Sequence, residues 1–292
     1  MIRRRRRPRF ARPLLLLACA ACEAPAPPPA ETPNDGLSAR VEDDAGQVLT
    51  LDADPLRILS LVPSATGILL ALGQGDRLVG RTDYDTAPEV AHLPSVGGGL
   101  GASVERIVTL DPDLVIHFRA DSDPGTPRQL EAAGIPHMAI RPDRVEDVRR
   151  ILLMIGAVVR ETARADSLLA ALDAGLAEVS ARVGEAPRPR VVLIGGDPPT
   201  VAGPGTFLHE LVVLAGGENA FADVGELYAP VSLEEIIRRD VDLILAPESV
   251  RVPPALEGIP LRRIPLDVLT PGLEVTGSAR VLASILHPDI TW

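Results

Sequence analysis

Two glutamates occupy the same place in an internal repeat of this 292-residue chain. Residues 103–116 match residues 232–245 at six identical positions, which include Glu105 and Glu234. Each glutamate falls in the first turn of a predicted helix, where a carboxylate interacts favourably with the helix dipole. The equivalent placement also supports a second interpretation, in which two similar lobes each expose one carboxylate to a partner of matching symmetry.

Three charged residues, Arg81, Arg119 and Asp267, directly follow predicted strands. Open α/β sheets bind ligands beyond the carboxyl ends of their strands, so these side chains are candidates for lining a cleft. The glycine-rich run 97–101 lacks the strand-loop-helix spacing of nucleotide-binding fingerprints. It predicts either a close approach of the backbone to a ligand or a plain loop.

Catalytic and metal-binding patterns are missing from the sequence. It contains no Gly-x-Ser-x-Gly elbow, Walker loop or His-Glu-x-x-His motif, which are signatures of hydrolases, NTPases and zinc proteases. No paired spacing is present among the five histidines, which are His92, His117, His137, His209 and His287. We therefore predict no catalytic residue, no metal site and no cofactor.

Strands and helices alternate in the predicted secondary structure, which indicates mainly parallel sheets. After a hairpin around residues 43–46, the first half has predicted strands at 58–62, 78–80, 114–118 and 137–140 and helices at 65–72, 103–110 and 128–133. Ser64 is expected to cap the first of these helices. The second half has predicted strands at 190–194, 243–246 and 263–266 and helices at 207–214, 232–239 and 278–286. The fold class is therefore α/β, with two similar lobes and a ligand cleft between them.

Residues 145–183 contain no proline and only two glycines, and their apolar residues recur at helical spacing. At 1.5 Å per residue, one continuous helix would span about 60 Å, much longer than the average helix of a compact domain. We expect one long spine helix that joins the two lobes. Two helices broken at Gly156 or Gly175 are the alternative.

The first 22 residues have the pattern of a secretory signal, because seven arginines precede the apolar run 14–18. That run is shorter than the roughly 20 residues of a transmembrane helix. Small residues before Cys19 and Cys22 resemble the lipobox of bacterial lipoproteins. Cys22 is the preferred lipidation site because it leaves the longer apolar region, and a cut near Ala21 in an ordinary secreted protein is the alternative.

The net charge of the remaining chain argues against two classes of binding partner, and its cysteine content argues against a disulfide. Without the seven N-terminal arginines, 22 basic residues face 40 acidic ones, a net charge of about −18. Nucleic acids and anionic membranes require a clustered basic face. Neither is expected as a partner, and the membrane would be reached through the lipid anchor alone. Both cysteines precede the folded body, so no disulfide is expected there.

Nearly all of residues 56–290 resemble the single-helix-hinge class of periplasmic binding proteins, the receptors of ABC importers for cobalamin, siderophores and haem. The similarity is greatest to the cobalamin-binding members. It is carried by Arg57-Ile-Leu-Ser-Leu-Val-Pro-Ser-Ala-Thr, Leu70-Ala-Leu-Gly, Leu78-Val-Gly, Ser103-Val-Glu-Arg-Ile-Val, Asp111-Pro-Asp-Leu-Val-Ile, Leu214-Ala-Gly-Gly-Glu-Asn-Ala-Phe and Val231-Ser-Leu-Glu-Glu-Ile-Ile.

This resemblance implies a receptor rather than an enzyme. It would be a periplasmic, lipid-anchored monomer that captures a corrinoid and delivers it to a dimeric ABC permease. The two permease-docking glutamates of the family fall on Glu105 and Glu234. Its cleft-rim aromatic residues fall on Tyr84 and Tyr228, whose flat faces and polar tips suit a corrin or porphyrin ring. The tryptophan of the cobalamin-binding members is replaced here by Gly99.

The resemblance leaves other ligands open. A haem or ferric-siderophore receptor of the same class is one alternative, since a tyrosine such as Tyr84 can be an axial ligand of haem iron. A zinc or manganese receptor would need convergent histidines and carboxylates, and a secreted α/β hydrolase is the remaining alternative.

The predicted organisation is a signal peptide with a lipidated cysteine at 1–22, a Pro-rich tether at 23–36, an N-terminal lobe at 37–144, the spine helix at 145–185 and a C-terminal lobe at 186–292.

Overall fold

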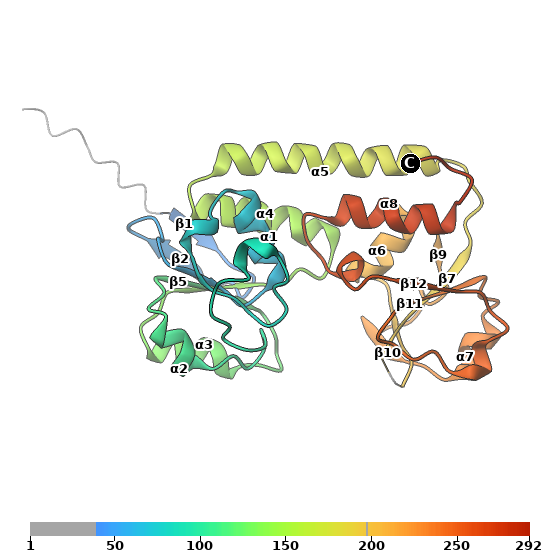
Figure 1. Ribbon diagram of the computed structural model, residues 1–292, viewed down its shortest axis with the longest axis horizontal. Helices are drawn as coiled ribbons and strands as arrows, with labels where there is room; N and C mark the ends of the chain where they lie inside the picture. The colour runs from blue at the N-terminus through green and yellow to red at the C-terminus, as the bar shows by residue number, and fades with distance from the viewer. Residues whose placement is uncertain (1–38, 197) are drawn as a thin grey trace, which may run out of the picture. The chain divides into compact units, whose positions relative to one another are not determined.

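The computed structural model describes residues 39–196 and 198–292, which lie in one compact unit (Figure 1). The predicted signal peptide, Cys22 and the tether lie outside these residues. Within the described part of the chain, no helix is long and apolar enough to cross a membrane.

The N-terminal lobe is built on a four-stranded parallel sheet with the order β4-β3-β5-β6. Its strands are β3 (Ile58–Ser60), β4 (Leu78–Gly80), β5 (Leu114–Phe118) and β6 (His137–Ile140). Its helices are α1 (Pro63–Ala71), α2 (Val104–Thr109) and α3 (Gly125–Ala132), with short 3-10 turns η1 (Gly75–Arg77) and η2 (Pro88–Val90). The predicted hairpin is present as antiparallel β1 (Ala39–Glu42) and β2 (Val48–Leu51).

The C-terminal lobe has a mixed sheet with the order β10-β8-β7-β11-β12, and β9 also pairs with β7. The strands are β7 (Arg190–Gly195), β8 (Thr200–Ala202), β9 (Glu218–Asn219), β10 (Tyr228–Pro230), β11 (Leu243–Pro247) and β12 (Leu261–Ile264). The helices are α6 (Phe207–Leu214), α7 (Leu233–Arg238) and α8 (Val275–Leu286), with η3 (Pro254–Leu256) and η4 (Asp267–Leu269). Sequence patterns missed the short strands β8, β9 and β10, which have only two or three residues each.

Residues 145–183 form two helices, so the prediction of one continuous spine was wrong. The helix α4 spans Val145–Val158, α5 spans Thr162–Val183, and the chain turns between them at Arg160, which has φ +59°. Gly156 permits the two helices to pack closely, because a Cβ there would lie only 2.5 Å from the Cβ of Ala165. The helix α4 therefore folds back along α5, and α5 bridges the lobes by packing against α4, α6 and α8 (Figure 1).

One side chain ties the start of α4 to the other lobe. Glu210 on α6 accepts hydrogen bonds from Arg144 Nε at 2.7 Å and from the backbone N–H of Val145 at 2.8 Å. A carboxylate is favoured at a helix N-terminus because the unpaired N–H groups there carry partial positive charge. This contact fixes α4 against the C-terminal lobe.

The internal repeat folds in the same way in both lobes. Ser103 Oγ accepts the N–H of Arg106, Ser232 Oγ accepts the N–H of Glu235, and each serine caps its helix. One residue in each helix anchors it in the core, since Ile107 and Ile236 are fully buried. The repeated serines and isoleucines therefore have structural roles.

Aspartates finish the same motif by joining it to the neighbouring strand. Asp113 accepts the backbone N–H of Arg57 beside β3 at 3.0 Å, and Asp242 accepts the N–H of Arg190 on β7 at 2.7 Å. The two lobes thus reproduce one helix–turn–strand unit, and Glu105 and Glu234 occupy equivalent, exposed positions on it.

Two histidines that are 20 residues apart in sequence meet on adjacent strands. His117 Nε2 on β5 lies 3.1 Å from His137 Nδ1 on β6, and His117 Nδ1 lies 3.2 Å from the carbonyl oxygen of Phe118. When His117 Nδ1–H donates to that carbonyl, its Nε2 accepts from His137 Nδ1–H, so the pair is neutral. Burial lowers the pKa of both imidazoles below the ordinary value of 6.5.

Acid is expected to destabilise the protein through this pair. The unfolded chain takes up protons at a higher pH than the folded protein, so this contribution to stability is complete above pH 6.5 and declines below it. The decline is at most about 1.4 kcal/mol per pH unit for each histidine. Urea unfolding at stepped pH should show a shallower decline in His137→Asn than in the wild type, whereas His92→Asn, which alters an exposed histidine, should keep the full decline. Equal slopes in all three proteins would contradict this assignment.

Candidate functional site

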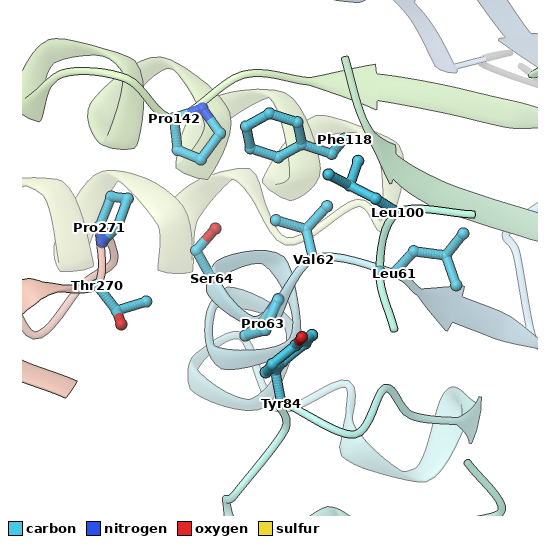
Figure 2. A pocket seen from close by; sticks show the side chains of 11 residues that line it. Leu61, Val62, Pro63, Ser64, Tyr84, Leu100, Phe118, Pro142, Thr270 and Pro271 are labelled. Atoms are coloured by element: carbon cyan, nitrogen blue, oxygen red, sulfur yellow. The ribbon is translucent and has the colours of Figure 1, made fainter. Parts of the chain in front are cut away.

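A pocket of about 250 Å³ is lined by residues of both lobes (Figure 2). Most of its N-terminal-lobe residues come directly after strands, which is where open α/β sheets bind ligands. The residues after β3 are Leu61, Val62, Pro63 and Ser64; Phe118 ends β5, and Pro142 follows β6. Tyr84, Gly99 and Leu100 come from the long β4–α2 connection, and Thr270 and Pro271 come from the loop before α8 in the other lobe.

The lining of this pocket is almost entirely apolar. Phe118, Leu100, Pro142 and Pro271 supply carbon surface, and no Asp, Glu, Lys, Arg or His belongs to the lining in the described part of the chain. Such a surface holds a ligand by burying its apolar face. It lacks the acid–base pair or activated nucleophile that catalysis of proton or group transfer requires.

Tyr84 stands at the pocket on a tightly bonded turn. Thr82 is fully buried and donates its hydroxyl to Asp85 at 2.8 Å, and the Tyr84 N–H donates to Thr82 Oγ1 at 3.2 Å. These bonds hold the backbone, while the Tyr84 ring remains 68% exposed. A ligand that covers this ring would remove a large apolar face from water at little cost in backbone ordering.

Gly99 is required by a close approach between two backbone segments. A Cβ at this position would lie 2.3 Å from the carbonyl oxygen of Leu61, whereas a Cβ at Gly98 would meet nothing closer than 3.7 Å. The glycine therefore lets the 97–101 loop lie against the segment that joins β3 to α1. This backbone arrangement has no room for a side chain at position 99, and Leu100 contributes apolar surface to the pocket.

Tyr228 lies in the other lobe on β10, where it pairs with Ala202 of β8. It is 53% exposed and is not among the residues that line the pocket. Partial burial raises the pKa of its hydroxyl, and the negative charge of Asp143, between β6 and α4, raises it further. The Tyr228 hydroxyl therefore stays protonated at neutral pH.

The three charged candidates do not line the pocket. Arg81 Nη1 donates to the carbonyl oxygen of Thr82 at 2.9 Å, and its buried Nε has no hydrogen-bond partner within residues 39–196 and 198–292. Arg119 Nη1 donates to the carbonyl oxygen of Asp44 at 2.7 Å, and Asp267 Oδ1 accepts the N–H of Val268. The strand-end rule indicated the edge of the sheet at which the pocket lies, but the lining groups there are apolar.

Sequence reasoning missed several lining residues for this reason. Leu61 and Pro142 follow strands as Arg81 and Arg119 do, and Phe118 ends one, so the same rule applied to apolar residues would have found them. Thr270 and Pro271 carry no such signal, because their place in the pocket depends on how the two lobes meet.

Glu105 and Glu234 are exposed on α2 and α7, away from the pocket lining. The Ser103 hydroxyl donates to Glu105 Oε2 at 2.9 Å, and this bond lowers the pKa of the Glu105 carboxyl. Glu105 is therefore ionised at neutral pH. Among the residues that the structure describes, no group of three or more His, Cys, Asp or Glu side chains could hold a metal ion.

Comparison with known proteins identifies the family of this fold. The model of the family "Periplasmic binding protein" matches residues 58–251. The chain is 31% identical over 201 residues to the vitamin B12-binding protein of Yersinia pestis (strain Pestoides F), covering 68% of this chain and 72% of that protein. It is 26% identical over 219 residues to the uncharacterized ABC transporter substrate-binding lipoprotein YvrC of Bacillus subtilis, covering 72% of this chain and 69% of that protein.

A solved structure agrees with these relatives. The apo form of the periplasmic heme-binding protein RhuT from Roseiflexus sp. RS-1 superimposes with a TM-score of 0.72 at 26% identity, covering 80% of this chain and 98% of that one. Family match, relatives and fold all belong to transport receptors. The chain is therefore a member of the periplasmic binding protein family, an extracytoplasmic substrate receptor of an ABC importer, and not an enzyme.

Proposed function

We propose that this protein captures a corrinoid in the pocket between its lobes and delivers it to the permease as a monomer. The observation that carries the proposal is the uncharged, apolar lining with the exposed Tyr84 ring beside it. A corrin presents a broad face and neutral amide groups, which such a surface can cover without burying an unpaired charge. A ferric siderophore with a negative charge would be better matched by basic side chains, which this lining lacks.

The size of the pocket is consistent with contact to only part of such a ligand. Pockets for drug-sized ligands are typically about 300–1,000 Å³, and this one is about 250 Å³. The remainder of a corrin would extend beyond the pocket. Tyr228, with its protonated hydroxyl, is our candidate for contact with that remainder.

Haem is the second candidate, favoured by one specific observation. Tyr84 is an exposed tyrosine at the pocket, and a tyrosine oxygen can bind haem iron as an axial ligand. The hydroxyl of Tyr84 therefore distinguishes the two ligands. Haem would need it, whereas a corrinoid would need only the ring.

Variants at Tyr84 are expected to separate these ligands. Replacing the ring, in Tyr84→Ala, should weaken cyanocobalamin binding roughly 10- to 100-fold, because the apolar contact of one large side chain is lost. Tyr84→Phe should keep wild-type affinity for cyanocobalamin. Calorimetric and absorbance titrations with cyanocobalamin and haemin would measure both, and Leu56→Ala, which removes an exposed side chain outside the pocket, is the control. Tight haemin binding that disappears in Tyr84→Phe would move the assignment to haem.

For permease docking we propose Glu105 and Glu234 as the two acidic contacts. Each glutamate has an apolar residue three positions later, Val108 and Ile237, which correspond in the repeat and are 49% and 52% exposed. Residues three apart lie on the same side of a helix. Each lobe thus offers a carboxylate beside an apolar side chain, which suits a partner with two equivalent sites that combine a basic group with an apolar surface.

Anchoring to a membrane is proposed at Cys22. The small residues before this cysteine and the Pro-rich segment after it support the proposal, as does the name of the related lipoprotein from Bacillus subtilis. The lipid would hold the receptor near the membrane, while the tether leaves the folded body free to meet its permease.

A further inference from the structure

Ser64 does not cap its helix, contrary to the prediction from sequence. The N-cap of α1 is Val62, Pro63 occupies the first helical position, and Ser64 is the second. Ser60 orders this turn instead, since its hydroxyl donates to the carbonyl oxygen of Val62 at 2.8 Å. The hydroxyl of Ser64 is left without a role in the fold.

That hydroxyl is buried, unpaired and directed at the pocket. Ser64 is only 9% exposed, and its Oγ has no hydrogen-bond partner anywhere in residues 39–196 and 198–292. Ser64 lines the pocket, and Figure 2 shows its hydroxyl pointing toward the side on which Pro142 and Phe118 lie. A buried hydroxyl without a hydrogen-bond partner raises the free energy of the folded protein, and a hydrogen bond to an acceptor on a ligand would remove this penalty.

The backbone at this point offers a second donor. The carbonyl oxygen of Val62 accepts the N–H groups of Ala65 and Thr66. Ser64 comes before Ala65 in the first turn of the helix, and its backbone N–H has no acceptor within α1. No acidic residue occupies the first turn of this nine-residue helix. Gly67 leaves open space beside the helix, so no side chain of that turn neutralises the positive end.

On the C-terminal-lobe side of the pocket, the hydroxyl of Thr270 already has a hydrogen-bond partner, since it donates to the carbonyl oxygen of Leu266 at 3.2 Å. We propose that Ser64 Oγ–H and the Ser64 N–H form a subsite for an oxygen acceptor, a carboxylate or an amide carbonyl, carried at the edge of an apolar ligand. The inference rests on the proposed function in that it assigns a subsite within the same pocket. Tyr84 and the apolar lining would hold the flat body of the ligand, and the subsite would fix its orientation.

Small probes test the subsite without assuming the natural ligand. Benzoate and benzamide combine an apolar ring with an acceptor oxygen, whereas toluene has the ring alone. In ¹⁵N–¹H spectra of the full folded protein, benzoate and benzamide should move the Ser64 amide proton further downfield than toluene does, because only they add a hydrogen bond to the effect of the ring. Ser64→Ala should weaken both acceptor probes by about tenfold, the value of one buried hydrogen bond, and leave toluene unaffected. A larger loss for benzoate than for benzamide would identify the carboxylate as the preferred acceptor.

The matched control is Thr66→Val, which removes another buried, unpaired hydroxyl from the same helix but outside the pocket lining. It should leave the affinity for all probes unchanged, and neither variant should lower the melting temperature, because each removes an unpaired buried group. Equal binding of benzoate to Ser64→Ala and the wild type, or an unmoved Ser64 amide, would overturn the subsite. If the probes behave as expected while cyanocobalamin and haemin fail to bind the wild type, the subsite stands and the proposed ligand class fails.

Discussion

Reversing the charge of both proposed docking glutamates, in the double variant Glu105→Arg with Glu234→Arg, is expected to abolish uptake and leave ligand binding unchanged. Both side chains are exposed, outside the pocket lining, and in short helices anchored by Ile107 and Ile236 rather than by the glutamates. The fold and the pocket should therefore persist. Placing like charges against a basic partner costs several kcal/mol at an interface, and two such sites would act together on the docked complex.

The control must carry the same change of charge at unrelated places. Asp76 and Glu257 are exposed carboxylates, one in each lobe, and neither belongs to the repeat. The variant Asp76→Arg with Glu257→Arg should transport normally, in cells or in proteoliposomes that contain the permease. If the Glu105/Glu234 variant transports at the wild-type rate, those residues are not the docking contacts. If both double variants fail equally, net charge rather than position is responsible.

Substitution of Gly99 by alanine is expected to destabilise the protein by about 1–3 kcal/mol, as overpacking typically does. The added methyl would meet the Leu61 carbonyl oxygen at 2.3 Å, so one of the two backbone segments must move. Both segments line the pocket. The same movement should therefore weaken ligand binding, and Gly99→Trp should weaken it further instead of restoring the aromatic contact of the cobalamin-binding members.

Gly98→Ala provides an internal comparison one residue away. Its methyl would make only ordinary contacts, at 3.7 Å from the Leu100 carbonyl oxygen and 3.8 Å from Tyr84 Cε2, so its effect on stability should stay within about 0.5 kcal/mol. Urea unfolding with cyanocobalamin titration of both variants gives the test. If the two alanine variants match in stability and affinity, the close approach at Gly99 has no energetic importance.

The candidate site shows how far sequence rules reach. The positions of strand ends were predictable, and they indicated the edge of the N-terminal sheet at which the pocket lies. The side chains that line the pocket at that edge were not predicted, because charged residues were taken as the candidates for ligand contact. Arg119 instead bonds the turn of the β1–β2 hairpin, which lies 75 positions earlier in the chain, and Phe118 beside it lines the pocket. Which of two neighbouring side chains faces a cavity depends on contacts that are distant in sequence.

The chain segment before the second lobe shows the same limit in the secondary structure. Its apolar spacing predicted helix correctly throughout residues 145–183 apart from three residues, since periodicity is a local property. The reversal at Arg160 carries no proline or glycine at the turn itself, and it is stabilised by the packing of Gly156 against Ala165. A contact between two helices cannot be read from the periodicity of either one.

The sequence by itself determined the α/β fold class, the two-lobed organisation and the equivalence of Glu105 and Glu234. These follow from local periodicity and from a repeat whose serines, isoleucines and aspartates perform the same tasks twice. Only the tertiary structure decided that Ser64 is an unpaired donor in the pocket instead of a cap, that His117 meets His137, and that Gly99 lies against Leu61. The physical reason is that short-range rules fix which elements form, whereas hydrogen bonding and close packing between elements decide which side chains remain free to bind a ligand.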